Sequence, residues 1–221
     1  MTEPFQNRRQ AGAFLATRLD QYARRDDVVV LALPRGGVPV AHEVATALAA
    51  PLDIFLVRKL GLPGHPELAM GAIASGGIRV MNEDVMGWAR VPASAVDAVV
   101  RTEQAELERR EAEYRMGRPL VALAGRIVIL VDDGLATGST MRAAVEAVRA
   151  LGPARVVVAV PVGAPAACLH MASIADELVC AHSPEPFSAV GQWYRDFSQT
   201  TDAEVQALLA TQARPGAVTL H

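Results

Sequence analysis

The stretch "VILVDDGLATGST", residues 128–140, decides the fold, because it joins an apolar run to a loop of acids, glycines and hydroxyls. The apolar residues at 127–131 predict a buried strand, and their lack of alternation is typical of a parallel sheet covered on both faces. Two adjacent carboxylates, Asp132 and Asp133, follow where this strand ends. Ligands of open parallel sheets bind beyond the carboxyl ends of the strands, so the acids indicate a ligand site.

The residues that follow the acids predict an anion site. Gly134 and Gly138 permit positive φ angles and a close approach of the backbone to a ligand. The helix expected at 139–151 presents unpaired N–H groups and about half a positive charge at its start. Further hydroxyl donors come from Thr137, Ser139 and Thr140. A sugar phosphate suits this loop, since its phosphate would bind the N–H groups while its hydroxyls, or a bound Mg²⁺, bind the carboxylates.

Helices and strands alternate along most of the chain. Hydrophobic periodicity predicts a helix at 8–22, a strand at 28–33, a helix at 38–50 and a strand at 52–57. Further strands are expected at 126–131, 155–160 and 177–181, and a final helix at Thr201, where Thr201 and Glu204 fit a capping box. This order predicts an α/β fold in which helices flank a parallel central sheet.

Residues 60–120 interrupt the alternation. Short strand-like pieces flank Ser75-Gly76-Gly77, which indicates a hairpin turn, and 94–116 reads as a long charged helix. We therefore expect a single domain over 1–221, in which 60–120 is a flexible loop or hairpin with a long-helix insertion that acts as a lid. The segment 182–221 is expected to form a small C-terminal hood.

Composition narrows the function. The net charge of −3 disfavours a general nucleic-acid surface, and no apolar run approaches the ~20 residues of a membrane helix. The polar start, MTEPFQNRRQ, has no apolar signal core, so we expect a cytoplasmic protein without membrane or nucleic-acid partners. Cys168 and Cys180 lack a metal or redox spacing and are expected to be small buried hydrophobes. Lys59 is the only lysine among 21 basic residues, which indicates a role for a compact ammonium group.

Three segments carry a family resemblance. "VILVDDGLATGSTM" (128–141) closely resembles the phosphoribosyl-pyrophosphate (PRPP) motif of type I phosphoribosyltransferases. "LALPRGGVPVA" (31–41) is similar to their pyrophosphate loop, and "LVRKLGLPGHPELAMGAIASGG" (56–77) to the Arg-Lys and flexible catalytic loop of the orotate and adenine members. Together the resemblance covers most of 28–160. The long charged helix and the "WYRDF" tail are not typical of the well-known nucleobase enzymes, so the chain resembles a separate branch of this superfamily.

The resemblance implies Mg²⁺-dependent transfer of ribose 5-phosphate from PRPP to a nitrogenous acceptor, with release of pyrophosphate. It assigns catalysis to Asp132, Asp133, Lys59 and Arg58, and metal binding to the two aspartates. The 5-phosphate would be bound by Gly134, Leu135, Ala136, Thr137, Gly138, Ser139 and Thr140. Pyrophosphate would be bound by Arg35, Gly36 and Gly37. A homo-oligomer, namely a dimer, is the expected assembly.

The acceptor stays open. "PFSAVGQWYRDF" (186–197) resembles the base-stacking segment of the 6-oxopurine members, which makes Phe187, Trp193 and Tyr194 candidates for acceptor binding. These rings could equally fill the core. The strand at 155–162 has no lysine to read an oxo group, so hypoxanthine and guanine are disfavoured. His65 and Glu67 in the expected lid have no assigned role.

The alternative function is a PRPP-sensing regulator or a protein-interaction domain without catalysis. No helix-turn-helix pattern or basic arm is visible in the sequence, which favours an enzyme.

Overall fold

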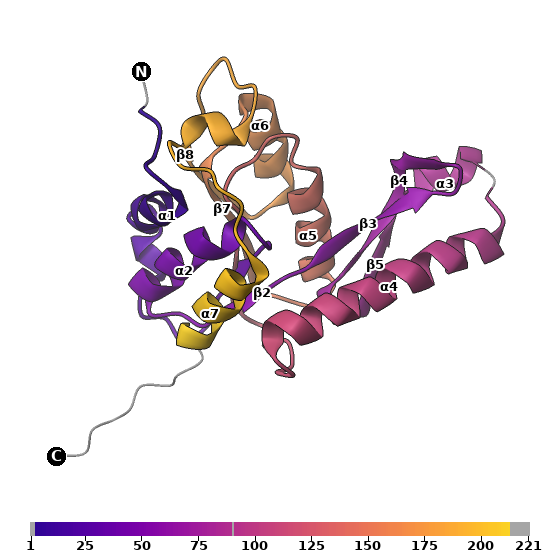
Figure 1. The fold of residues 1–221 in the computed structure, drawn as a ribbon, viewed down its shortest axis with the longest axis horizontal. Coiled ribbons are helices and arrows are strands. Elements are labelled where there is room, and N and C mark those ends of the chain that lie inside the picture. Colours follow the sequence, from indigo (N-terminus) through magenta and orange to yellow (C-terminus); the bar gives the residue numbers. More distant parts are fainter. Residues whose placement is uncertain (1–2, 90, 213–221) are drawn as a thin grey trace.

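A computed structural model describes residues 3–89 and 91–212, apart from the side chains of Pro66, Glu67 and Trp88. Five parallel strands form the central sheet in the order β2-β1-β6-β7-β8 (Figure 1). The strands are β1 (Val28–Ala32), β2 (Leu52–Ile54), β6 (Ile127–Val131), β7 (Arg155–Val162) and β8 (Glu177–His182). The predicted class, a parallel sheet flanked by helices, is confirmed.

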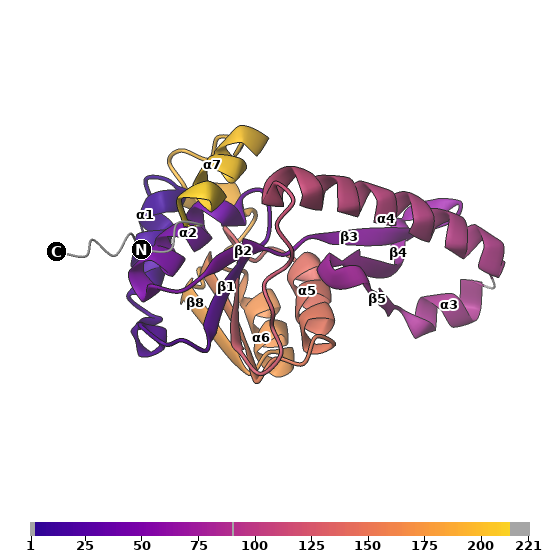
Figure 2. The same ribbon diagram turned by 90° about the horizontal axis from the view of Figure 1, so that it is seen from below.

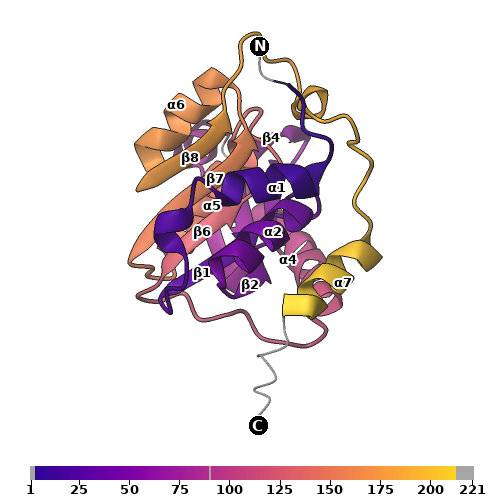
Figure 3. The same ribbon diagram turned by 90° about the vertical axis from the view of Figure 1, so that its left-hand side faces the viewer.

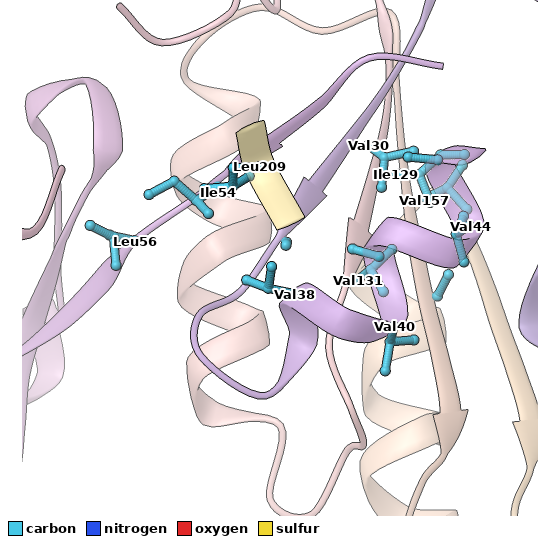
Figure 4. Close-up of a cluster of buried hydrophobic side chains, with 14 of the residues drawn as sticks. Val30, Val38, Val40, Val44, Ile54, Leu56, Ile129, Val131, Val157 and Leu209 are labelled. Atoms are coloured by element: carbon cyan, nitrogen blue, oxygen red, sulfur yellow. The ribbon is translucent and has the colours of Figure 1, made fainter. Parts of the chain in front are cut away.

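Helices cover both faces of the central sheet. One face carries α1 (Arg8–Ala16), α2 (Gly37–Leu48) and α7 (Asp202–Gln212), and the other carries α5 (Ser139–Arg149) and α6 (Pro165–Ile174) (Figure 3). Successive strand residues point to opposite faces. Val30 therefore packs with α2, as Figure 4 shows, while Val29 packs on the side of α5.

A second sheet projects from the central one (Figure 1). It is antiparallel in the order β3-β4-β5 and comprises β3 (Val57–Leu62), β4 (His65–Ala74) and β5 (Ile78–Met81). The helices α3 (Glu83–Ala89) and α4 (Ala93–Arg115) follow. We call residues 57–115 the arm. Its sheet lies between α4 on one face and α5 on the other (Figure 2).

A buried arginine fastens the arm to the central sheet. Arg115, at the end of α4, is 4% exposed. Its Nε donates to Asp53 Oδ1 at 3.0 Å, and its Nη1 to Glu111 Oε1 at 2.7 Å. Its Nη2 donates to the carbonyl oxygen of Ile54 at 2.7 Å. The guanidinium thus joins the last turn of α4 to the edge strand β2.

Several sequence predictions are confirmed. The hairpin turn lies at Ser75–Gly77 as the 3-10 turn η2, and the long helix is α4. The backbone N–H of Glu204 donates to Thr201 Oγ1 at 3.1 Å, which is the N-terminal half of the predicted capping box at α7. None of the helices within the described residues is long and apolar enough to span a bilayer.

Other predictions are wrong in extent. The helix expected at 8–22 ends at Ala16 and is followed by a separate 3-10 turn, η1 (Asp20–Tyr22). The strand expected at 52–57 is divided, because the chain leaves the central sheet after Ile54 and starts β3 at Val57. The sequence predicted neither β3 nor α6.

Removing the guanidinium at the base of the arm tests its structural role. We expect Arg115→Met to lower the free energy of unfolding by about 3–5 kcal/mol, because it leaves the Asp53 and Glu111 carboxylates without their counter-ion. Arg109→Met is the matched control, since this side chain is 60% exposed and its ion pairs are screened by solvent. Urea unfolding of both variants measures the difference, and equal effects would contradict the role of Arg115.

Candidate functional site

The two aspartates lie at the carboxyl end of β6, in the centre of the sheet. Asp132 Oδ1 accepts the backbone N–H of Asp133 at 2.8 Å. Asp133 Oδ2 accepts from Arg8 Nε, also at 2.8 Å, and these two side chains are only 15% and 12% exposed. The hydroxyl of Tyr194 donates to the carbonyl oxygen of Asp133 at 2.5 Å. The second acid is therefore fixed by groups from both ends of the chain.

Burial sets the electrostatics of this pair. It raises the pKa of Asp132 well above its ordinary value, and the charge of Asp133 adds to the effect. Burial also raises the pKa of Asp133, although the hydrogen bond and charge of Arg8 act in the opposite direction. The site concentrates negative charge that a single arginine compensates, so it favours a ligand with hydroxyl donors or an associated cation.

The predicted pyrophosphate loop touches the acids directly. A Cβ atom on Gly36 would lie 2.1 Å from Asp133 Oδ2, and one on Gly37 would lie 2.7 Å from the carbonyl oxygen of Val131. Leu33 also donates its N–H to this carbonyl, at 2.9 Å. A side chain at Gly36 would displace the Asp133 carboxylate, and one at Gly37 would collide with the backbone of β6. The two loops that the sequence singled out therefore share one edge of the sheet.

The predicted phosphate loop leads from the acids into α5. Gly138 has φ of +75° and precedes the first residue of α5, whose N-terminus has no side-chain cap. Leu135 anchors the loop, since its N–H donates to Val162 O at 2.9 Å and its carbonyl oxygen accepts from Ala164 N at 2.8 Å. Thr137 is exposed beyond this anchor. Its Oγ1 accepts the N–H of Ser139 over a long 3.4 Å, and both residues remain within reach of solvent. An anion could replace this weak contact at the start of the helix.

Arg58 and Lys59 point to opposite faces of the arm sheet. Arg58 Nε donates to Glu103 of α4, so its guanidinium is engaged away from the acids. Lys59 is exposed, and its side-chain ammonium makes no hydrogen bond or ion pair with the residues that the structure describes. It lines a cleft of about 320 Å³ between the arm sheet and α5, together with Ser139 of the phosphate loop. The structure thus brings Lys59, but not Arg58, towards that loop.

The side chain of Arg35 is directed towards α7, and His65 and Glu67 of the expected lid belong to β4. Arg35 Nη1 is 3.7 Å from Asp202 Oδ1 of α7, in a small cavity of about 120 Å³ that Arg109 and Arg110 also line. His65 begins β4 and is exposed, whereas the side chain of Glu67 lies outside the described residues.

The aromatic segment packs onto the loop of the acids. The side chain of Val190 fills the space that a Cβ on Gly134 would need, at 2.5 Å. Phe187 and Trp193 stack with ring centroids 6.5 Å apart and are half-buried. Tyr194 is 5% exposed and contacts Phe197 at 5.1 Å, so its ring has no free stacking face here. Residues 186–197 thus pack on the loop of the acids through Val190 and Tyr194, whereas α7 packs on α2 and α4. The end of the hood expected at 182–221, from 213 onward, lies outside the described residues.

Arg8 is the site residue that sequence reasoning missed. It lies 125 residues from Asp133, and no local pattern marks it among the arginines. Its Nη1 donates to Ser198 O at 2.7 Å, and its Cζ lies 4.0 Å from the centroid of the Phe197 ring. This cation therefore connects α1, the acids and the aromatic segment.

The fold and the paired loops define an α/β domain of the phosphoribosyltransferase class, and comparison with known proteins agrees. The phosphoribosyl transferase domain family matches residues 3–180, so the chain belongs to this family. The chain is 52% identical over 205 residues to a protein of Mycobacterium tuberculosis that is found in strains CDC 1551 and H37Rv. That protein has the provisional name phosphoribosyl transferase. The match covers 93% of this chain and 46% of that protein, so the chain spans about half of these relatives.

Two further proteins are similar to this chain. The crystal structure of TT1426 from Thermus thermophilus is 44% identical, with a TM-score of 0.85, over 96% of this chain and 100% of that one. The bifunctional protein PyrR of Chloroflexus aurantiacus is 33% identical over 129 residues, which are 57% of this chain and 65% of that protein. The resemblance drawn from residues 28–160 is confirmed.

The unequal surroundings of the two acids predict opposite effects on stability. Asp132→Asn should raise the free energy of unfolding by about 1 kcal/mol, which corresponds to about 2–4 °C in Tm, because it removes a buried charge and keeps an acceptor for the N–H of Asp133. Asp133→Asn should lower it by about 3 kcal/mol, because Arg8 loses its counter-ion.

The pH dependence of the first effect follows from linkage. The raised pKa of Asp132 means that the folded wild type binds more protons than the unfolded chain above the ordinary pKa of 3.8. Wild type therefore loses stability relative to Asp132→Asn as pH rises from that value. Thermal unfolding between pH 4 and 8 measures the gap, and a gap that narrows with rising pH would refute the assignment.

Proposed function

We propose that this chain binds PRPP and transfers its ribose 5-phosphate group to a nitrogenous acceptor, with release of pyrophosphate. The observation that carries the proposal is the contact between the two loops. Gly36 lies against the Asp133 carboxylate, and the N-terminus of α5 follows the same acids a few residues later. A ligand with a phosphate at one end, ring hydroxyls in the middle and a second anionic group fits this succession of groups.

Each group has a chemical task in the proposed reaction. The amides and hydroxyls of 134–140 would hold the 5-phosphate, and Asp132 and Asp133 would accept hydrogen bonds from the ribose hydroxyls. Gly36 and Gly37, which lie against the same acids, would bind the pyrophosphate together with Arg35. Arg35 would have to turn from Asp202 to the same group, and the 3.7 Å separation of that pair is compatible with such an exchange of partners.

The donors of the site fit Mg²⁺ that arrives with the ligand. Within the described part of the chain, no group of three or more acidic, histidine or cysteine side chains is placed to hold a metal. Mg²⁺ is commonly held by one or two carboxylates and completed by phosphate oxygens and water, and Asp132 and Asp133 supply such a pair. When bound, the ion would neutralise the leaving pyrophosphate.

The mechanism rests on charge placement. The bond from C1 of the ribose to the pyrophosphate oxygen breaks as the acceptor nitrogen attacks from the opposite face, and the ribose becomes cationic in the transition state. The carboxylates stabilise this developing charge, because a partly buried anion interacts strongly across a medium of low dielectric constant. Lys59 at the edge of the neighbouring cleft would approach the departing anion. The aromatic segment would shield the reacting carbon from water, a competing acceptor.

The acceptor is proposed to lie beside Phe187 and Trp193, whose stacked rings pack in the same cluster as Val190, the residue next to Gly134. A flat nitrogenous ring suits such a surface. Since β7 contains no lysine, an acceptor other than a plain 6-oxopurine is expected. A cytoplasmic homodimer remains part of this proposal.

Calorimetry with Mg²⁺ and PRPP tests the site. We expect Asp132→Asn with Asp133→Asn to weaken PRPP binding by about tenfold or more, because the ribose hydroxyls and the cation lose their charged acceptors. The control is Asp97→Asn, an exposed substitution on α4. Unchanged affinity in the double variant would refute the PRPP site.

A screen of nucleobases and other amines for pyrophosphate release from PRPP then tests transfer. Turnover with one acceptor class supports the enzyme. PRPP binding without turnover by any acceptor would favour the sensing role instead.

The single lysine has its own test in the same assay. Lys59→Ala should lower turnover or PRPP affinity about tenfold, and Lys59→Arg should restore little, because the guanidinium is a planar fork and not a compact ammonium. Arg79→Ala is the control, since Arg79 is exposed on β5 of the same sheet and does not line the cleft. Full activity of Lys59→Arg would show that the position requires only a positive charge.

A further inference from the structure

The fold brings together two thiols that the sequence spacing did not connect. Cys168 lies in the first turns of α6, Cys180 lies on β8, and their sulfur atoms are 3.4 Å apart. Both cysteines are free. Cys168 is buried, as predicted, but Cys180 is only half-buried. The two cysteines are 12 positions apart in the sequence, so only the tertiary structure reveals the pair.

The thiol pair packs directly behind the phosphate loop. A Cβ on Gly163 would lie 2.5 Å from the sulfur of Cys168 and 3.2 Å from that of Cys180. The same Cβ would lie 3.2 Å from Leu135 Cβ, on the side of the loop. The two hydrogen bonds that anchor Leu135 come from the residues on either side of Gly163. Gly163 therefore lies between the two sulfur atoms and Leu135, the residue that anchors the phosphate loop.

The two thiols differ in reactivity. The contact with Cys180 lowers the pKa of Cys168 to about 7, because a neighbouring S–H group stabilises the thiolate. The pKa of Cys180 is raised by the same contact and by burial. While Cys168 is protonated, its S–H group donates to the sulfur of Cys180 and the S–H group of Cys180 donates to the carbonyl oxygen of His182 at 3.1 Å. When Cys168 ionises, the S–H group of Cys180 is free to turn to the thiolate instead. Cys168 is thus the better nucleophile, and Cys180 is the partner that resolves its oxidation.

We propose that Cys168 and Cys180 form a redox pair whose disulfide weakens anion binding by the loop at 134–140, a regulation that rests on the proposed function. The oxidant is a hydroperoxide. The Cys168 thiolate attacks one peroxide oxygen and gives a sulfenic acid, while the O–O bond breaks and water leaves after protonation. The Cys180 sulfur then attacks the sulfenic sulfur, which releases a second water. Two thiols and one hydrogen peroxide become one disulfide and two waters.

The disulfide would act on the loop through Gly163. The sulfurs must approach from 3.4 Å to about 2.05 Å, a change of about 1.3 Å across a backbone that both already touch. A tightly packed interior transmits such a shift to its neighbours. The displacement therefore reaches Leu135, and with it the alignment of the N–H groups at the start of α5.

The experiment compares the full chain with Cys168→Ser and Cys180→Ser, reduced and after hydrogen peroxide. Intact mass and thiol titration should show loss of two hydrogens and both thiols in wild type alone. The affinity for Mg²⁺ and PRPP should fall about fivefold or more on oxidation and recover with dithiothreitol. Cys180→Ser, treated identically, should keep its affinity, which controls for methionine oxidation.

Hydrogen exchange of the amides at 134–140 provides a readout without ligand. If the reduced protein does not bind PRPP, the proposed function fails, and altered exchange in oxidised wild type alone still supports the redox pair. A disulfide that does not form, or one that leaves both the exchange and any measurable affinity unchanged, would overturn the inference.

Discussion

The ion pair between Arg8 and Asp133 is the interaction on which the site depends. Two carboxylates at the end of a buried strand lose hydration, and an isolated buried charge would cost several kcal/mol. Arg8 reaches Asp133 because α1 lies very close to α2. At Gly12 of α1, the backbone of α2 at Val40 is so near that a side chain would not fit. The aromatic segment then covers the guanidinium at Phe197. The N-terminal helix and the C-terminal segment are thus both organised around one carboxylate that the proposed ligand also needs.

The sequence predicted the features that depend on near neighbours. The strand at 127–131, the turn at Ser75–Gly77 and the start of α7 each follow from residues within a few positions. Features that depend on remote partners were missed. The division between β2 and β3 lies where Arg115, some sixty residues later in the chain, binds the carbonyl oxygen of Ile54. Helix α6 was missed because Pro165 interrupts an apolar run, whereas proline is well tolerated in the first turn of a helix.

The same distinction applies to the site. Both glycine-containing loops were found from the sequence, because the residues that define each loop are consecutive in the chain. The adjacency of Arg58 and Lys59 in the sequence did not show that both reach the same site. Adjacent residues of a strand face opposite sides, and a helix covers each side of the arm sheet. Arg8 carries no local signal, and the proximity of the thiols arises only when α6 returns alongside β8.

The parallel course of α4 and the arm sheet constrains how the length of the arm can vary. A strand preserves its inward and outward faces only if residues are removed in pairs, and each pair shortens it by about 6.6–6.8 Å. A helix covers that distance with about four to five residues. Leu107 and Val100 of α4 are buried in the same cluster as Leu60 and Met70 of the sheet. Shorter or longer arms on this scaffold should therefore differ by coordinated steps, about one helical turn for every two residues of each strand.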